Sequence, residues 1–293
     1  MFIPPYRITL SGGGLKGIAH IGALEVLQEQ GLLKALREYV GISAGALVSF
    51  CLCLGSTLSE LRMIISLLDF GLVRDLDPET MLNFPETFGL DTGANLEKFL
   101  KTILRARRLS PTITFAELEA LKLGPTLSVI AMNMNTCQPA EFCAAKTPGT
   151  EVAFAVRASM SIPIYFSPAI DSVGHMYADG GVYFSSPFKY LSNGRRQHTL
   201  SIAFSDSHKQ RGEIKSLVEY LYQLYYCLDY ETGKQLREEW GHQIMYIECG
   251  AVNVIHFEAS QEEKMRLMDS GRRGAEEFIK RPGRKPTRRF SMT

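Results

Sequence analysis

The chain has 293 residues, of which 45% are hydrophobic and 22% are charged. These proportions exclude a disordered chain, a collagen and a disulfide-stapled miniprotein, and a chain of this length can bury a large core. The 32 basic and 31 acidic residues leave a net charge of +1, so no global field attracts nucleic acid and no nucleic-acid partner is expected. The charge is unevenly spread, because residues 272–293 carry +6 and the first 271 residues sum to −5.

Neither targeting nor spanning segments are visible in the sequence. Residues 1–7 lack a charged start followed by an apolar stretch, so no signal peptide is expected. The most apolar stretch, residues 46–54, is about half of the roughly 20 residues that a spanning helix needs. The six cysteines are scattered without a C-x-x-C pair, which predicts buried free thiols in a reducing compartment. We therefore expect a cytoplasmic protein, with peripheral attachment to membranes left open.

The first part of the chain alternates short strands with helices. Residues 7–10 form a β-branched run that ends in a glycine loop, and apolar residues at helical spacing follow up to Gly31. A brief strand at 39–40 leads into a tight turn at 41–45 and a buried helix over 46–54. This βαβα order predicts a three-layer α/β/α fold with a mostly parallel central sheet.

The remaining elements are predicted from periodicity and from turn residues. Residues 58–123 are predicted to be helical, with loop signals at Pro78, Pro85, Gly89 and Pro111. Strands are expected at 126–132, 199–204, 244–247 and 252–257, with a hairpin at 169–178. Further helices are expected at 152–159, 214–228 and 260–279. Beyond Pro282 the chain is basic and is expected to be disordered.

The turn at residues 41–45 has the pattern G-x-S-x-G, with Ser43 between Gly41 and Gly45. Its place between a strand and a helix is what a nucleophile elbow requires, because the glycines allow the sharp turn that exposes the serine hydroxyl at a helix N-terminus. The alternative is an ordinary glycine-lined turn. The context favours the elbow.

Gly12, Gly13, Gly14 and Gly17 match G-x-G-x-x-G after a strand and before a helix, which allows two interpretations. With Glu38 located 21 residues beyond Gly17, the loop could bind a dinucleotide. Its backbone N–H groups could instead converge on a developing oxyanion. The serine on the next elbow favours the oxyanion interpretation, because a dinucleotide site gives no reason for that serine.

A serine nucleophile needs a base, and Asp179-Gly180-Gly181 follows the predicted hairpin. A lone D-G-G is usually a turn, because Asp and Gly both tolerate left-handed backbone. The six histidines occupy no motif that suggests catalysis. His20 and His175 are expected to be structural or solvated.

Taken together, the glycine run at 11–22, the G-x-S-x-G turn and the D-G-G resemble the patatin-like phospholipases. The resemblance continues in residues 158–166 and 256–278, so it covers about residues 8–280. Two departures stand out. The family often has an Asn-containing triplet after D-G-G where this chain has Ser185-Ser186-Pro187, and residues 70–123 match poorly.

The resemblance implies one patatin-like domain over residues 1–280, with a lid or substrate-shaping segment at 70–123, followed by a basic tail at 281–293 that is expected to be disordered. It further implies a lipid acyl hydrolase that cleaves phospholipid or lysophospholipid esters through an acyl-serine intermediate, with no metal and no cofactor. The implied residues are Ser43 as nucleophile, Asp179 as base, Gly12, Gly13 and Gly14 as oxyanion hole with Ala44 as a further donor, and the motif glycines Gly17, Gly41, Gly45, Gly180 and Gly181.

Other features each keep more than one interpretation. Lys16 stands where the family has Lys or Arg, and it either attracts an anionic headgroup or is a solvated or loop-bracing cation. The basic tail could hold the protein on anionic lipid, contact RNA, act as a localisation signal or only aid solubility. A further set of apolar residues either forms a lid or acyl tunnel or belongs to the ordinary core: Phe70, Leu72, Val73, Phe84 and Phe88.

Three alternative functions remain open from the sequence. The same acyl-enzyme could pass its chain to an alcohol, which would make the protein an acyltransferase. The glycine loop alone would suit a nucleotide-binding module. A catalytically inactive lipid-binding scaffold is the third, although Ser43 and Asp179 are both present.

Overall fold

The computed structural model describes residues 4–67, 70–75, 82–205, 217–250 and 259–281, together with Ile214 and Val252. The predicted basic tail and, apart from Val252, the predicted strand at 252–257 lie outside these residues. Among the described helices, none is both long and apolar enough to cross a bilayer.

Eight of the described strands form one large mixed sheet in the order β10-β9-β1-β2-β4-β8-β7, with β5 also paired to β4. Five neighbouring strands are parallel: β10 (Ile244–Glu248), β9 (Thr199–Ser205), β1 (Arg7–Leu10), β2 (Glu38–Gly41) and β4 (Thr126–Asn133). Antiparallel pairing extends the sheet beyond β4 through β5 (Gln138–Phe142), β8 (Met176–Asp179) and β7 (Ala169–Ile170). The predicted parallel core is confirmed, and the antiparallel strands complete it.

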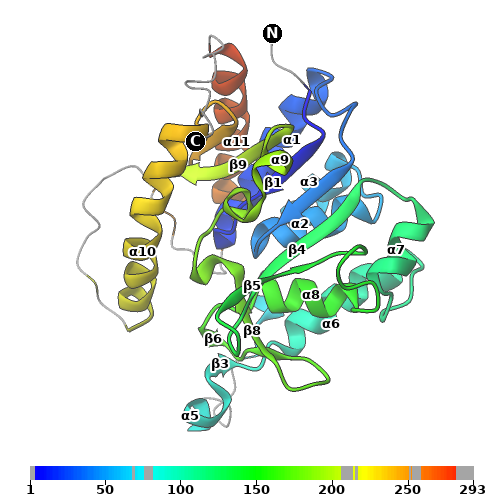
Figure 1. Ribbon diagram of the computed structural model, residues 1–293, viewed down its shortest axis with the longest axis vertical. Helices are drawn as coiled ribbons and strands as arrows, with labels where there is room; N and C mark the ends of the chain where they lie inside the picture. Colours follow the sequence, from blue (N-terminus) through cyan, green and yellow to red (C-terminus); the bar gives the residue numbers. More distant parts are fainter. Residues whose placement is uncertain are drawn as a thin grey trace, which may run out of the picture.

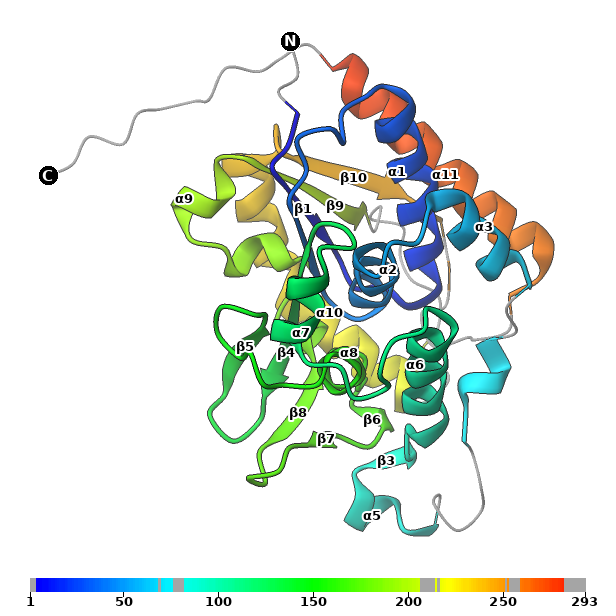
Figure 2. The ribbon, with the colours of Figure 1, turned by 90° about the vertical axis from the view of Figure 1, so that its right-hand side faces the viewer.

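Helices cover both faces of this sheet, which confirms the three-layer α/β/α prediction (Figures 1 and 2). One face carries α1 (Ile18–Glu29), α2 (Ala44–Cys53), α3 (Leu58–Leu67), α8 (Val152–Ser159) and α11 (Gln261–Lys280). The other face carries η4 (Pro187–Tyr190) and α10 (Leu217–Trp240). Alternate residues of each strand enter the two cores, so Tyr39 packs on the first face and Val40 on the second.

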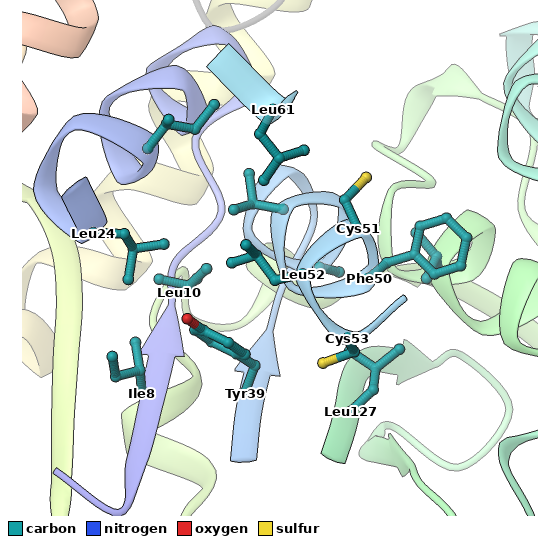
Figure 3. Close-up of a cluster of buried hydrophobic side chains, with 14 of the residues drawn as sticks. Ile8, Leu10, Leu24, Tyr39, Phe50, Cys51, Leu52, Cys53, Leu61 and Leu127 are labelled. Carbon is teal, nitrogen blue, oxygen red and sulfur yellow. The ribbon is translucent and has the colours of Figure 1, made fainter. Parts of the chain in front are cut away.

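The larger core lies between the sheet and α1 and α2 (Figure 3). Ile8 and Leu10 of β1 are fully buried there against Leu24 of α1. The α2 side chains Phe50 and Leu52 fill the same layer, as expected of a helix that is apolar all round. This packing fixes α2, and therefore the turn before it, against the carboxyl ends of β1 and β2.

Several helix ends follow local rules that the sequence carries. Helix α1 ends at Glu29. Gly31, two residues beyond, has φ +68°, and the Leu32 N–H donates to the Leu27 carbonyl at 2.9 Å. Helix α11 begins with a capping box in which Ser260 and Glu263 satisfy each other's backbone N–H groups. Helix α7 (Phe115–Leu121) begins in the same way at Thr114.

The middle of the chain departs from its predicted helical character. It contains η2 (Phe70–Val73), α5 (Phe84–Thr87), β3 (Gly89–Asp91) and α6 (Ala94–Ala106). Strand β3 pairs with β6 (Ile164–Phe166) in a second small sheet, and neither strand was predicted. Such short strands give too little periodicity to be recognised in a sequence. The prediction at Pro85 as a loop is also wrong, because Pro85 sits in the first turn of α5, where its missing N–H costs nothing.

Two further sequence predictions are corrected. Helix α10 runs to Trp240 rather than ending at 228. No proline lies between these two positions, and the single glycine there, Gly233, does not end the helix. Buried thiols are confirmed for Cys51, Cys53 and Cys249, whereas Cys137 and Cys227 are exposed. The remaining short helices are η1 (Gly14–Gly17), η3 (Gly180–Val182) and α9 (Asn193–Arg196).

Candidate active site

Ser43 stands in the tight turn between the carboxyl end of β2 and the first residue of α2. Its backbone has φ +52° and ψ −123°, a conformation that a non-glycine residue rarely adopts. Ser43 is only 5% exposed. A Cβ at Gly41 would lie 2.4 Å from the Ala46 Cα, and one at Gly45 would lie 2.2 Å from the Leu10 carbonyl oxygen. Only glycine fits at these two positions, so the G-x-S-x-G pattern has a steric cause.

The glycine loop after β1 lies directly against this turn. A Cβ built on Gly12 would be 3.2 Å from the Ser43 Cβ, and one on Gly17 would be 2.6 Å from the Ala44 Cβ. Gly14 opens η1 with φ +54°, a conformation that favours glycine. The first N–H groups of a helix have no partner within that helix, so the N–H groups of Gly14 in η1 and Ala44 in α2 remain the predicted oxyanion donors.

The peptide between Ser11 and Gly12 is held from both sides. His20 Nε2 donates to the Ser11 carbonyl at 2.9 Å, and the Gly12 N–H donates to the Ser185 carbonyl at 2.9 Å. The Gly12 amide is therefore engaged, which narrows the predicted oxyanion donors of this loop to Gly13 and Gly14. The departure at Ser185-Ser186-Pro187 thus supplies a backbone carbonyl to the loop, a contact that needs no asparagine.

Asp179 ends β8 and is 6% exposed. Its Oδ1 accepts the Gly181 N–H at 2.7 Å, while Oδ2 is buried and has no hydrogen-bond partner within the described part of the chain. Burial raises the pKa of Asp179 from 3.8 to about 6, and the nearby Ser43 hydroxyl and the Gly181 N–H partly oppose this rise. The Ser43 hydroxyl therefore lies close enough to the Asp179 carboxyl group to lower its pKa.

The structure therefore brings together the three motifs that the sequence singled out. The end of β1, the end of β2 and the end of β8 meet at one edge of the sheet, although Ser43 and Asp179 are far apart in the chain. Gly180 is required for this approach, because a Cβ there would lie 2.6 Å from the Ile130 carbonyl oxygen. A serine hydroxyl and a buried carboxyl group in one place suit acyl transfer.

Comparisons with known proteins identify the family. A model of the patatin-like phospholipases matches residues 8–192. The chain belongs to the patatin-like phospholipase family. The uncharacterised protein YqhO of Bacillus subtilis is 27% identical over 287 residues, covering 93% of this chain and 97% of that protein. The probable lipid hydrolase 463L of Invertebrate iridescent virus 6 is 32% identical over 180 residues, which are 61% of each chain.

Solved structures show the same fold. VipD from Legionella pneumophila superposes with a TM-score of 0.59 at 18% identity, over 94% of this chain and 67% of VipD. The type III effector ExoU of Pseudomonas aeruginosa gives 0.57 at 18% identity, and this chain spans about half (53%) of its length. Membership of the patatin-like phospholipases, together with the viral relative, supports lipid hydrolase activity for this chain.

The two histidines considered in the sequence analysis have partners other than Ser43 and Asp179. His20 is fully buried, stacks on Phe204 with ring centroids 4.7 Å apart, and has its pKa lowered to about 4 by burial. His20 is therefore neutral at pH 7, and its Nε2–H donates to the glycine loop. His175 lies in the β7–β8 hairpin with Nδ1 3.3 Å from an Asp171 carboxyl oxygen. Within the described residues, neither imidazole has a hydrogen bond to Ser43 or Asp179.

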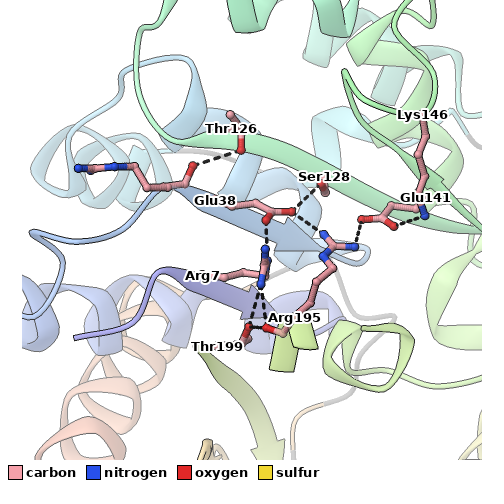
Figure 4. Close-up of polar contacts among 9 residues, drawn as sticks. Arg7, Glu38, Thr126, Ser128, Glu141, Lys146, Arg195 and Thr199 are labelled. Carbon is pink, nitrogen blue, oxygen red and sulfur yellow. Dashed lines mark hydrogen bonds and ion pairs between the residues drawn. The ribbon is translucent and has the colours of Figure 1, made fainter. Parts of the chain in front are cut away.

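Glu38 decides against the dinucleotide interpretation (Figure 4). It opens β2 opposite Arg7, at the amino end of the strands, whereas the glycine loop follows Leu10 at their carboxyl end. Its carboxylate is bound by Arg7 at 2.5 Å and by Arg195 at 2.6 Å, and Arg195 also contacts Glu141 at 2.7 Å. An acidic residue that is paired at the far end of the sheet cannot hold a ribose at the glycine loop.

The burial of Lys16 and of the middle segment can be compared with the sequence predictions. Lys16 is 4% exposed, so the interpretation as a solvated cation is wrong, while the headgroup and loop-bracing interpretations stay predictions. Of the apolar residues proposed for a lid or tunnel, Val73 is buried at 6% exposure and Phe88 is 54% exposed. No group of three or more His, Cys, Asp or Glu side chains among the described residues is placed to hold a metal ion.

Two serines at the end of α8, Ser159 and Ser161, were not identified as site residues from the sequence. Ser159 Oγ accepts the Ser43 N–H at 2.9 Å, and the Ser161 carbonyl accepts the Asp179 N–H at 2.8 Å. Both lie in the segment 158–166 that carries part of the family resemblance, which is the one signal in the sequence that could have drawn attention to them.

Proposed function

We propose that the chain hydrolyses phospholipid or lysophospholipid esters with Ser43 as nucleophile and Asp179 as base. The Ser43 hydroxyl attacks the ester carbonyl while Asp179 accepts its proton, and that proton then leaves with the alcohol product. Asp179 next takes a proton from water, whose oxygen attacks the acyl-serine. The bond from the acyl carbon to the Ser43 oxygen then breaks, the fatty acid leaves, and Asp179 returns the proton to the Ser43 oxygen. The observation that carries the proposal is the strained, buried Ser43 beside the buried Asp179 carboxyl group, whose Oδ2 has no hydrogen-bond partner among the described residues.

The raised pKa of Asp179 supports its role as base. A carboxylate with a pKa near 3.8 is a weak base for a serine hydroxyl, whereas a pKa of about 6 improves the match and still leaves the group ionised at pH 7. The N–H groups of Gly13, Gly14 and Ala44 would stabilise the oxyanion of the tetrahedral intermediate. Loss of one such donor typically costs about 3–4 kcal/mol of transition-state stabilisation.

The direct test is fatty-acid release from mixed phospholipid vesicles, with products identified by mass spectrometry. Wild type should release fatty acid and react with a fluorophosphonate, whereas Ser43→Ala should do neither. Asp179→Asn should fold and lose hydrolysis. Chain transfer to an added alcohol in place of fatty-acid release would assign the acyltransferase alternative. Vesicle binding without either product would assign the scaffold alternative.

We further propose that the sheet edge nearest the site meets the lipid surface. Exposed apolar side chains lie at this edge: Met134 after β4, Ile170 and Val173 in the β7–β8 hairpin, and Phe88 before β3. The Met134 N–H donates to the Met176 carbonyl at 2.8 Å, so the turn after β4 adjoins the β7–β8 hairpin. Strand β3 pairs with β6, which precedes β7 in the chain. Figure 2 shows α5, β3, β7 and β8 at one end of the molecule.

This edge lies beyond Asp179 along strand β8. Asp179 pairs with Ala131, and Met176 lies three residues before it, a distance of about 10 Å along a strand. Val173 is 74% exposed at the hairpin tip, so replacing it with aspartate should weaken binding to vesicles without unfolding the protein. Leu123→Asp is the matched control, because Leu123 is 43% exposed and precedes the opposite end of β4.

A further inference from the structure

Ser159 is the last residue of α8 and is completely buried. Its hydroxyl oxygen accepts the backbone N–H of Ser43 at 2.9 Å, across 116 residues of sequence, and donates its own proton to the Ile130 carbonyl at 2.6 Å. Both the donor and the acceptor capacity of this hydroxyl are therefore used by backbone groups. One of these groups belongs to the proposed nucleophile.

The bond from Ser159 completes a set of contacts around the peptide that joins Ile42 to Ser43. The Ile42 carbonyl accepts the Gly45 N–H at 2.8 Å, so this peptide is fixed at its oxygen by the turn and at its hydrogen by Ser159. Ser43 has φ +52°, which costs on the order of 1–3 kcal/mol relative to ordinary backbone conformations. Such a conformation persists only when the surroundings impose it, and Ser159 is a side chain placed to do so.

The same helix end also holds the proposed base. The Asp179 N–H donates to the Ser161 carbonyl at 2.8 Å, two residues beyond Ser159. The Ile130 carbonyl that Ser159 contacts belongs to β4, whose next residue, Ala131, pairs with Asp179. The end of α8 thus connects the turn that carries Ser43 with the strand pair that carries Asp179.

We propose that Ser159 is a positioning residue that holds Ser43 in its reactive backbone conformation, which sets the distance between the Ser43 hydroxyl and the Asp179 carboxyl group. The inference rests on the proposed function. Because Ser159 occupies the Ser43 N–H, that N–H is not an oxyanion donor, and the donors are left to Ala44, Gly13 and Gly14. Ser159 acts through Ser43 and does not touch the substrate in this assignment.

The test compares Ser159→Ala with Ser49→Ala. Ser49 lies on α2, is also fully buried, and its hydroxyl has no hydrogen-bond partner within the described residues, so its removal deletes a buried hydroxyl without deleting a bond. Ser159→Ala should lower kcat and the second-order rate of fluorophosphonate labelling by about 10- to 100-fold, the scale of a misplacement of roughly 1 Å, with KM changed less than about threefold. Ser49→Ala should change neither rate by more than about twofold.

Hydrogen exchange at the Ser43 amide gives a readout that does not depend on activity. Exchange at this amide should be faster in Ser159→Ala than in wild type and unchanged in Ser49→Ala. If Ser159→Ala does not fold, Ser159→Thr, which keeps the hydroxyl, is compared with Ser159→Val, which has the same shape without it. The threonine variant should retain the higher labelling rate.

Different outcomes overturn the proposed function and the positioning role of Ser159. A wild type that neither hydrolyses lipid esters nor reacts with the probe overturns the proposed function, and the positioning role with it, even if exchange at the Ser43 amide changes as expected. An active wild type whose Ser159→Ala variant matches Ser49→Ala in kcat and labelling rate overturns the positioning role alone. Equal exchange at the Ser43 amide in both variants also overturns it.

Discussion

Ionisation of Asp179 should raise activity and lower the stability of the folded protein. The group is buried, and its pKa rises from 3.8 in an exposed chain to about 6 in the folded protein. The folded state therefore binds this proton more tightly than the unfolded state, so its contribution to stability is complete below pH 3.8 and is lost as the pH rises to about 6. The difference corresponds to about 3 kcal/mol, at 1.36 kcal/mol for each pKa unit.

Replacing Asp179 with asparagine removes this titration while keeping an oxygen that can accept the Gly181 N–H. Relative to wild type, Asp179→Asn should therefore gain about 2–3 kcal/mol of unfolding free energy between pH 4 and pH 8, even though it abolishes hydrolysis. Urea unfolding of both proteins at pH 4, 6 and 8 measures this change, because the titration of all other groups cancels in the difference.

A matched control has the opposite sign. Asp171 has its pKa lowered, although burial alone would raise it, because the His175 and Val173 N–H groups and the Tyr177 hydroxyl bind its ionised form. Asp171→Asn should therefore lose stability relative to wild type as the pH rises through the titration of this group. A difference between wild type and Asp179→Asn that stays constant with pH, or that falls, would refute the assignment of a raised pKa to Asp179.

Further predictions concern the base, its pH dependence, metal ions and lipid contact. For wild type, kcat/KM should rise with pH with an apparent pKa near 6, because Asp179 must be ionised to accept a proton; a flat profile from pH 5 to 8 would contradict this. His175→Ala and His20→Ala should retain appreciable activity; a folded but inactive His175→Ala would indicate a triad. Calcium chelation should leave activity unchanged, since the described residues contain no carboxylate cluster, and full inhibition by a chelator would refute this. Val173→Asp should bind phospholipid vesicles more weakly than Leu123→Asp in co-sedimentation, and equal binding would exclude the hairpin from the lipid contact.

Local backbone geometry is the part of this protein that the sequence predicts well. The turn at Ser43 needs glycine at positions 41 and 45 because the neighbouring backbones approach within contact distance, and that requirement is visible as G-x-S-x-G. The order of strands and helices follows from periodicity, so the three-layer fold could be predicted as well. The short strands β3 and β6 could not be, since each is only three residues long and is stabilised by its partner rather than by its own pattern.

The sequence by itself determined the motifs, because each depends on residues that are neighbours in the chain. Only the tertiary structure decided how they are used. Packing buries Asp179 and raises its pKa, the Ser185 carbonyl engages the Gly12 amide, and Glu38 lies at the far end of the sheet from the glycine loop. Ser159 reaches Ser43 across 116 residues, a contact that no local pattern encodes because it exists only once α8 has packed against β4 and α2.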